Sequence, residues 1–349
     1  MLRCAPVIRE DDQPDDVDGT FAAAEAATPL EVLRFVRGAG QRGQQVALVT
    51  ITGLTGSSSR SIGTIMGVAE DGRFAGSLSG GCIEAAVVAE AQEAIRAGRP
   101  RQVRYGAGSP YIDIRLPCGG GVDLLFQPNP DPEEIREAVA CLEGREPVTL
   151  AQSRSGGFCI LPGHARQGPG WQMPGWRDET FLSWHAPPLA LVVVGHGAES
   201  LALVRLAMTC GIAPTLLSPD ERVVTLTAAH GVHASLLTNP RPATYLRADS
   251  WSALVFLFHD HAWEPSLLEQ ALGQPWLFIG AMGSRGTHAN RLAALRERGL
   301  PEEALARIVA PLGLIPSARD PVTMALSALA QVVESYRQAT ALVQAGGSG

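Results

Sequence analysis

The sequence lacks several features that would define its class at once. Its 349 residues contain no run of about 18 apolar residues, which a membrane span requires. The acidic N-terminus lacks the charged-then-apolar order of a signal peptide. The six cysteines are far apart and form no CxxC pair or dense framework. We therefore expect a cytoplasmic protein with reduced thiols.

Basic charge is also scarce, since 28 basic residues against 35 acidic ones give a formal net charge of −7. A nucleic-acid binder needs a basic face to neutralise phosphates, so no such partner is expected. Charged residues make up 18% and hydrophobic residues 46%, which is typical of globular rather than disordered chains. The length is sufficient for two domains with separate cores.

Changes in pattern divide the chain into five parts. Residues 1–25, rich in Asp and Pro, are expected to be a disordered lead-in, and residues 341–349 a flexible tail. A mixed α+β domain is expected over 26–130, and a helix with a β-rich connector over 131–188. Over 189–340 strands alternate with helices, which predicts a parallel sheet. The expected fold class is α/β, with a Rossmann-like C-terminal domain.

Particular segments carry these expectations. In the N-terminal half we expect the helix 29–37, the strands 46–52, 63–69, 74–77 and 122–126, and the helix 133–142. In the C-terminal half we expect the strands 190–194, 254–258 and 276–279, and helices ending at Cys210, Arg298 and Arg337.

The stretch GSLSGGCIE, from Gly76 to Glu84, leads from a turn into an apolar-periodic run and places Cys82 at or near a helix start. Unpaired N–H groups at a helix start favour anions and favour thiolate over thiol. One interpretation is a ligand cradle with a reactive sulfur, and the other is a tight turn with an inert buried cysteine. The candidate residues of the cradle are Ser79, Gly80, Gly81, Cys82 and Glu84.

Two other turns share this composition. The segment from Gly53 to Arg60 offers hydroxyl and backbone donors, with Ser57, Ser58 and Arg60 as candidate oxyanion ligands. Cys118, followed by Gly119 and Gly120, immediately precedes a strand. If these turns converge they form a site with two sulfurs and many donors, whereas the alternative is a set of unrelated surface turns.

The second half begins with a strand followed by Gly195, His196 and Gly197, then a helix and a second strand ending near Asp220. This is the order of a dinucleotide-binding unit. Ser200 replaces the third glycine, so a Rossmann-type fold without NAD is favoured over bound NAD(P).

Two more strands end in polar clusters. His259, Asp260 and His261 follow one, and imidazoles in this spacing can bind Zn or Fe, or can simply be hydrogen-bonded to loop backbone. Ser284 and Arg285 follow the next and repeat the oxyanion-binding composition. Ligands of open α/β sheets bind beyond the carboxyl ends of strands, where both clusters are expected.

Together these motifs resemble the XdhC/CoxI family, the accessory proteins of xanthine dehydrogenase and related molybdenum hydroxylases. The resemblance runs from about Val46 to Val333. It rests on TGLTGSSSRSIGTIMGV, GSLSGGCIE, CGGGV, VVVGHGAES, HDH, IGAMGSR and APLGL. Ser59 stands where the family commonly has proline, Glu264 where Asp is usual, and Ala198 to Ser200 where a Val-containing stretch is common.

The resemblance implies a maturation factor that binds the molybdenum cofactor, protects it while a cysteine desulfurase supports its sulfuration, and delivers it to an apo molybdoenzyme of the xanthine dehydrogenase type. This is an accessory role rather than an enzyme's own turnover. It implies Cys82 as the sulfur nearest Mo, Cys118 as a second, and Glu84 as the residue that orients Cys82. Phosphate or pterin oxygens would lie on the two Ser/Arg turns, and His259 and Asp260 would line a cleft.

Two alternatives stay open, an NAD(P)-dependent oxidoreductase and a metal-dependent hydrolase at the His-Asp-His cluster. The sequence leaves undecided which molybdoenzyme is served, whether the pterin carries a cytosine nucleotide, and whether the chain is a homodimer.

Overall fold

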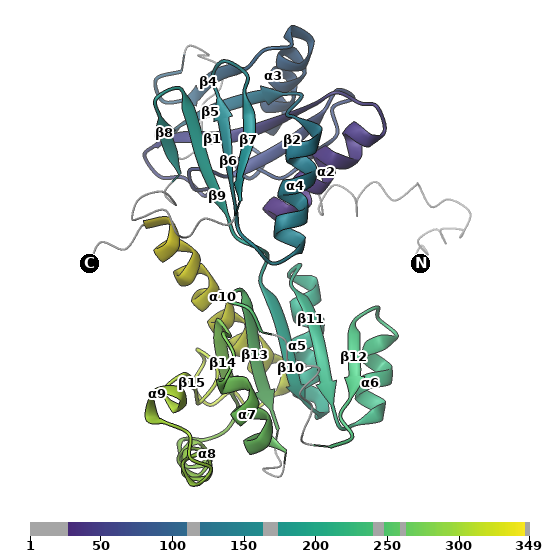
Figure 1. Ribbon diagram of the computed structural model, residues 1–349, viewed down its shortest axis with the longest axis vertical. Helices are drawn as coiled ribbons and strands as arrows, with labels where there is room; N and C mark the ends of the chain where they lie inside the picture. Colours follow the sequence, from purple (N-terminus) through teal and green to yellow (C-terminus); the bar gives the residue numbers. More distant parts are fainter. Residues whose placement is uncertain (1–26, 110–118, 163–173, 240–247, 259–262, 346–349) are drawn as a thin grey trace, which may run out of the picture. The chain divides into compact units, whose positions relative to one another are not determined.

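The computed structural model describes residues 27–109, 119–162, 174–239, 248–258 and 263–345. The chain forms two compact units, one ending at His185 and the other beginning at Ala186 (Figure 1). The first unit combines helices with antiparallel sheets and the second combines helices with a parallel sheet, which confirms the expected fold class.

The first unit is built on a five-stranded antiparallel sheet in the order β3-β2-β1-β5-β4. Its strands are β1 (Val46–Thr55), β2 (Ile65–Ala69), β3 (Phe74–Ala75), β4 (Arg101–Gly106) and β5 (Gly121–Pro128). Its helices are α2 (Pro29–Gln41), α3 (Glu84–Ala97) and α4 (Pro132–Glu143).

The central strand β1 is buried on both faces. Val46 and Leu48 pack with the apolar sides of α2 and α4, whereas Ala47, Val49 and Ile51 pack with α3. This alternation follows from the period-2 geometry of a strand. Because both faces are covered, the first seven residues of β1 are all buried, and they are apolar except for Thr50 and Thr52.

The expected β-rich connector is a second antiparallel sheet in the order β7-β6-β9-β8. It consists of β6 (Val148–Ser153), β7 (Phe158–Pro162), β8 (Gly175–Arg177) and β9 (Thr180–His185). A buried hydrogen bond of 2.7 Å from Thr50 Oγ1 to Gln152 Oε1 joins it to β1. The connector is therefore part of the first unit.

The topology brings the turns of the first sheet to one edge. Because neighbouring strands are antiparallel, the ends of β1, β3 and β4 and the starts of β2 and β5 lie on the same side. The connections 56–64 and 76–83 leave from that edge, and so do both described ends, at 107–109 and 119–120, of the connection between β4 and β5. These connections contain the three Gly-rich turns singled out in the sequence.

The second unit has six parallel strands in the order β12-β11-β10-β13-β14-β15. They are β10 (Ala190–Gly195), β11 (Ala213–Ser218), β12 (His233–Leu236), β13 (Ser252–Leu257), β14 (Phe278–Ala281) and β15 (Ile308–Val309). The helices are α5 (Gly197–Thr209), α6 (Glu221–Ala228), α7 (Glu264–Leu272), α8 (Arg285–Glu297), α9 (Glu302–Leu305) and α10 (Pro321–Ala345).

This strand order is that of the doubly wound Rossmann fold. From β10 the chain first adds strands on one side of the sheet and then, from β13 onward, on the other side, so the topological switch point lies between β10 and β13. Helices α5 and α10 cover one face of the sheet, whereas α7 and α8 cover the other (Figure 1). Helix α10 continues to Ala345, beyond the expected end at Arg337. The tail expected over 341–349 is therefore wrong for residues 341–345, which contain no helix breaker.

No helix within the described part of the chain combines the length and apolarity needed to cross a membrane.

Candidate functional site

The loop that carries Cys82 is organised by one carboxylate, that of Glu84. Its Oε1 accepts hydrogen bonds from Ser77 Oγ at 2.8 Å and from the backbone N–H groups of Leu78 and Ser79 at 3.1 and 2.9 Å. Its Oε2 accepts from Ser79 Oγ at 2.6 Å and from the Ile83 N–H at 3.1 Å. The loop from Ser77 to Ile83 is thus hydrogen-bonded to the first residue of helix α3.

The electrostatics of Glu84 follow from these donors. The side chain is buried, and burial alone would raise the pKa of its carboxyl. The hydrogen bonds from Ser79 and Ser77 outweigh burial and lower the pKa from 4.5 to about 2. Glu84 is therefore a fixed anion at neutral pH, and the loop's own uncharged donors stabilise its charge.

Cys82 itself is exposed and forms no disulfide. Its backbone N–H donates to Ser79 Oγ at 3.0 Å, and Ser79 is in turn bound by Glu84. Gly80 and Gly81, with φ of +76° and +102°, adopt left-handed conformations that glycine allows. Helix α3 begins two residues later, at Glu84, so the expectation of a cysteine near a helix start is confirmed and a buried cysteine is excluded.

Arg60 joins the first Ser/Gly turn to the Cys82 loop. Its Nε donates to the carbonyl oxygen of Ser77 at 3.1 Å, and its backbone N–H donates to Ser58 Oγ at 3.1 Å. Among the described residues, neither terminal nitrogen of its guanidinium has a partner. Ser57 and Ser58 are exposed beside it. The two turns therefore meet, with a cation held next to the thiol loop.

The third turn reaches the same edge. A Cβ added at Gly56 would lie 3.2 Å from the Cα of Gly120, so the two backbones are in contact. Gly119, exposed and with φ of +68°, precedes it. Cys118 lies outside the described residues. The structure thus brings Ser57, Ser58, Arg60, Gly119 and Gly120 to the edge where the Cys82 loop starts.

In the second unit the glycine turn after β10 lies at the reversal point of the sheet. A Cβ at Gly195 would lie 2.5 Å from the carbonyl oxygen of Leu257, so only glycine fits there. The ring of His196 packs against Phe258 with centroids 5.7 Å apart. Gly197, with φ of +82°, begins α5, and the buried Ser200 donates to the His196 carbonyl oxygen at 3.2 Å.

Asp220 lies where a dinucleotide fold carries its ribose-binding acid. Its Oδ1 accepts from the Arg222 and Val223 N–H groups at 2.9 and 3.4 Å and so caps α6.

The turn between β14 and α8 contains Ser284 and Arg285, both exposed. Ser284 Oγ accepts from the Thr287 N–H at 3.1 Å and so caps α8. His259, Asp260 and His261 lie outside the described residues. Among the residues that are described, no group of three His, Cys, Asp or Glu side chains could hold a metal ion.

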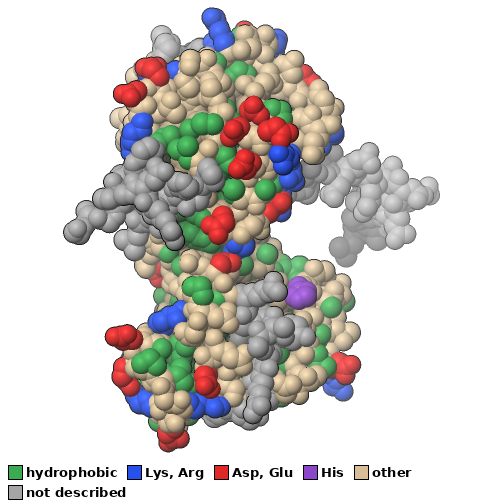
Figure 2. Space-filling model, in the orientation of Figure 1, with side chains coloured by type: hydrophobic (Ala, Val, Ile, Leu, Met, Phe, Trp, Pro, Cys, Tyr) green, Lys and Arg blue, Asp and Glu red, His purple; other side chains and the backbone are tan. Residues whose placement is uncertain are grey.

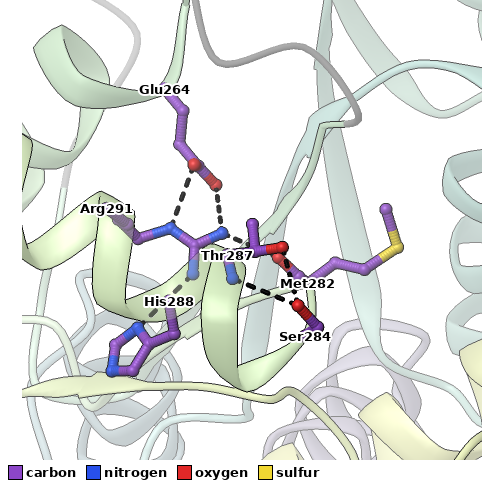
Figure 3. A network of polar contacts seen from close by, with 6 residues as sticks. All are labelled: Glu264, Met282, Ser284, Thr287, His288 and Arg291. Atoms are coloured by element: carbon purple, nitrogen blue, oxygen red, sulfur yellow. Dashed lines mark hydrogen bonds and ion pairs between the residues drawn. The ribbon is translucent and has the colours of Figure 1, made fainter.

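Behind that turn lies a buried ion pair that the sequence did not reveal (Figure 3). Arg291 Nε and Nη2 donate to Glu264 Oε2 and Oε1 at 3.0 and 2.9 Å, and Nη2 also donates to the Met282 carbonyl oxygen at 2.7 Å. Burial first, and then the Arg291 cation, lower the pKa of His288, while Glu264 opposes them. The pair fixes the turn to the start of α7.

Charge on the surface is mixed. The chain contains no lysine, so all 28 basic residues are arginine. Figure 2 shows acidic and basic side chains interspersed on the visible face of each unit. That face presents no extended basic patch of the kind a polyanion requires.

Known proteins match the chain over both units. The family model for the XdhC Rossmann domain matches residues 191–332, and that for the XdhC and CoxI family matches residues 39–106. The molybdenum cofactor insertion chaperone PaoD of Escherichia coli (strain K12) is 35% identical over 302 residues, which is 86% of each chain. The uncharacterized protein YqeB of the same organism is 23% identical over 303 residues, 82% of this chain and 43% of that one.

A solved structure has the same fold. The crystal structure of a xanthine dehydrogenase from Bacillus halodurans matches with a TM-score of 0.70 and 21% sequence identity, covering 89% of this chain and 96% of that one. At this identity the match concerns the fold alone. The family models and the identity to PaoD go further, and the chain belongs to the XdhC and CoxI family.

Proposed function

We propose that this chain binds the molybdenum cofactor and passes it to an apo molybdoenzyme. The single observation that carries the proposal is the position of Arg60, which is bound to the Cys82 loop through Ser77 and has two guanidinium nitrogens free of partners among the described residues. A cation and an exposed thiol are thereby held on one edge of the first sheet. The family and the relative PaoD, a cofactor insertion chaperone, support the same role.

The residues present fit such a cargo. The phosphate of a pterin is an oxyanion, and a guanidinium with free terminal nitrogens binds oxyanions in a bidentate manner. The Cys82 thiol is a soft donor of the kind that soft metal centres prefer. When bound, the cofactor would supply the molybdenum centre on which the recipient enzyme's chemistry depends.

The chain's own residues would hold and shield rather than turn over a substrate. Arg60, Ser57 and Ser58 would bind the oxyanion, and Glu84 would keep the Cys82 loop in shape. Gly80, Gly81, Gly119 and Gly120 would let the cargo approach the backbone. Within the second unit, Ser284 and Arg285 would offer an oxyanion contact of that unit's own.

The finer parts of the proposal concern partners. The recipient would be a xanthine dehydrogenase-type molybdoenzyme, and a cysteine desulfurase would supply sulfur while the cargo is held. Cys118 would be the second sulfur at the site. The alternatives are an NAD(P)-dependent oxidoreductase and a hydrolase that uses a metal at His259 and His261.

The test is a loading experiment. The purified chain is incubated under anaerobic conditions with molybdenum cofactor released from a purified molybdoenzyme, and is then separated from free cofactor by gel filtration. We expect molybdenum and pterin to elute with the chain in equal amounts. Elution of the chain without either would contradict the proposal, whereas saturable binding of NADH at micromolar concentration, or stoichiometric zinc or iron, would support one of the alternatives.

A further inference from the structure

A second arginine, Arg104 on β4, lies at the same edge of the first sheet as the Cys82 loop. Its three guanidinium nitrogens each bind a different segment. Nε donates to the Ala107 carbonyl oxygen at 2.7 Å, Nη1 to Asp123 Oδ2 at 2.8 Å, and Nη2 to Thr55 Oγ1 at 2.7 Å. One side chain thus joins the last residue of β1, the turn after β4 and the beginning of β5.

The surrounding backbone is shaped to accept this guanidinium. A Cβ at Gly121 would lie 2.8 Å from Arg104 Nη2 and 2.7 Å from the Ala107 carbonyl oxygen. A Cβ at Gly108 would lie 3.2 Å from Arg104 Nε. A side chain at position 121 would therefore displace Arg104, so the glycine at the start of β5 leaves room for the guanidinium.

Arg104 lies next to the proposed site. The backbones of Gly56 and Gly120 are in contact there. Thr55, which Arg104 binds, directly precedes Gly56, and Gly121, which leaves room for Arg104, directly follows Gly120. Together with the backbone pairing of Thr55 and Gly121, Arg104 therefore links the strand ends from which the Gly56–Arg60 turn and the Gly119–Gly120 turn leave. All three guanidinium nitrogens already have partners within the chain. Arg104 therefore positions the segments around the site and does not bind the cargo itself.

We propose that Arg104 is a positioning residue for cofactor binding, which acts by holding these two turns in contact. The inference rests on the proposed function, because it assigns Arg104 a part in binding that cargo. Lysine cannot replace it, since an ammonium is a point donor without the planar fork that reaches three segments.

The experiment compares the full chain with the variants Arg104→Gln, Arg104→Lys and Thr55→Ala. The control is Arg101→Gln at the other end of the same strand, where Arg101 is partly exposed and pairs with Glu90 at 2.6 Å. Each protein is loaded with released molybdenum cofactor, and the pterin retained after gel filtration is measured. Amide hydrogen exchange of the unloaded proteins is followed in peptides covering residues 53–60 and 119–126.

For Arg104→Gln and Arg104→Lys we expect about tenfold weaker retention, the size typical of losing a residue that orients a ligand-binding group. Exchange should be faster in both peptides and unchanged in helix α4. Thr55→Ala removes one of the three hydrogen bonds of Arg104 and perturbs the fold least. It should show a smaller loss of retention and a smaller increase in exchange. Arg101→Gln should match the wild type in both measurements.

Three results would overturn the inference. They are faster exchange with unchanged retention, weaker retention with unchanged exchange, and a fully retentive Arg104→Lys. Failure of the proposed function is distinguishable, because in that case the wild-type chain itself retains no cofactor.

Discussion

Arg60 Nε lies 3.1 Å from the carbonyl oxygen of Ser77, and this contact joins two turns that are 17 residues apart in the sequence. The hydrogen bond uses only the inner nitrogen of the guanidinium. This hydrogen bond orients the two terminal nitrogens of Arg60, which form no hydrogen bond with any described residue. The contact thus attaches a preformed cation to the loop that carries an exposed cysteine, at no cost in later rearrangement.

The first prediction concerns this cation. Arg60→Ala should weaken retention of the molybdenum cofactor by about tenfold to a hundredfold, because a charge-assisted hydrogen-bond pair contributes about 1.5–3 kcal/mol. Retention after gel filtration measures the effect. Arg73→Ala is the matched control, since Arg73 pairs with Asp71 in the turn at the opposite edge of the same sheet. Equal retention by both variants would contradict the role of Arg60.

The second prediction concerns Glu84 and pH. A carboxyl pKa lowered from 4.5 to about 2 contributes stability that is fully present above pH 4.5 and is lost as the pH falls toward 2. The contribution is on the order of 3 kcal/mol. Glu84→Gln should therefore be less stable than the wild type at pH 7, and the difference should shrink below pH 4.5.

Urea unfolding at a series of pH values measures that difference. Glu93→Gln is a suitable control, because Glu93 lies on the surface of the same helix α3 and pairs with the exposed Arg96 and the partly exposed Arg101. A difference between wild type and Glu84→Gln that does not change between pH 7 and pH 3 would show that the carboxylate charge does not hold the loop.

The third prediction concerns the buried pair of Glu264 and Arg291, whose side chains are 3% and 1% exposed. Glu264→Ala should destabilise the second unit by about 3–5 kcal/mol, because it leaves a buried guanidinium without its counter-charge. The double variant Glu264→Leu with Arg291→Met should lose less than Glu264→Ala alone. Urea denaturation of the three proteins measures this, and a single variant within about 1 kcal/mol of the wild type would contradict it.

Much of the fold could be predicted from local pattern. Strands such as β1, β10 and β13 are predominantly apolar because helices or a second sheet cover both faces, and this leaves a strong signal. Boundaries were less certain. Helix α10 passes Arg337 because the following residues are ordinary helix formers, and Thr340 bonds back to Tyr336 within the helix.

The residues of the three Gly-rich turns could be predicted from the sequence, but the long-range contacts that support these turns could not. Glu84 was expected to orient Cys82, and its bonds to residues at most seven positions away make such a role plausible from the sequence. Arg104 and Arg291 were missed, because their partners lie up to 49 residues away and only the folded topology brings them together. Nothing in the local pattern distinguishes either from a surface arginine.

The most direct test of the account is cofactor transfer by Cys82→Ala. The loaded chain is mixed anaerobically with an apo molybdoenzyme of the xanthine dehydrogenase type, and the activity gained is compared for wild type, Cys82→Ala and Cys210→Ala. Cys210 is an exposed cysteine of the second unit and serves as the control. We predict that Cys82→Ala remains folded but activates the enzyme no more than free cofactor does, while Cys210→Ala matches the wild type. Full activation by Cys82→Ala would contradict the central claim.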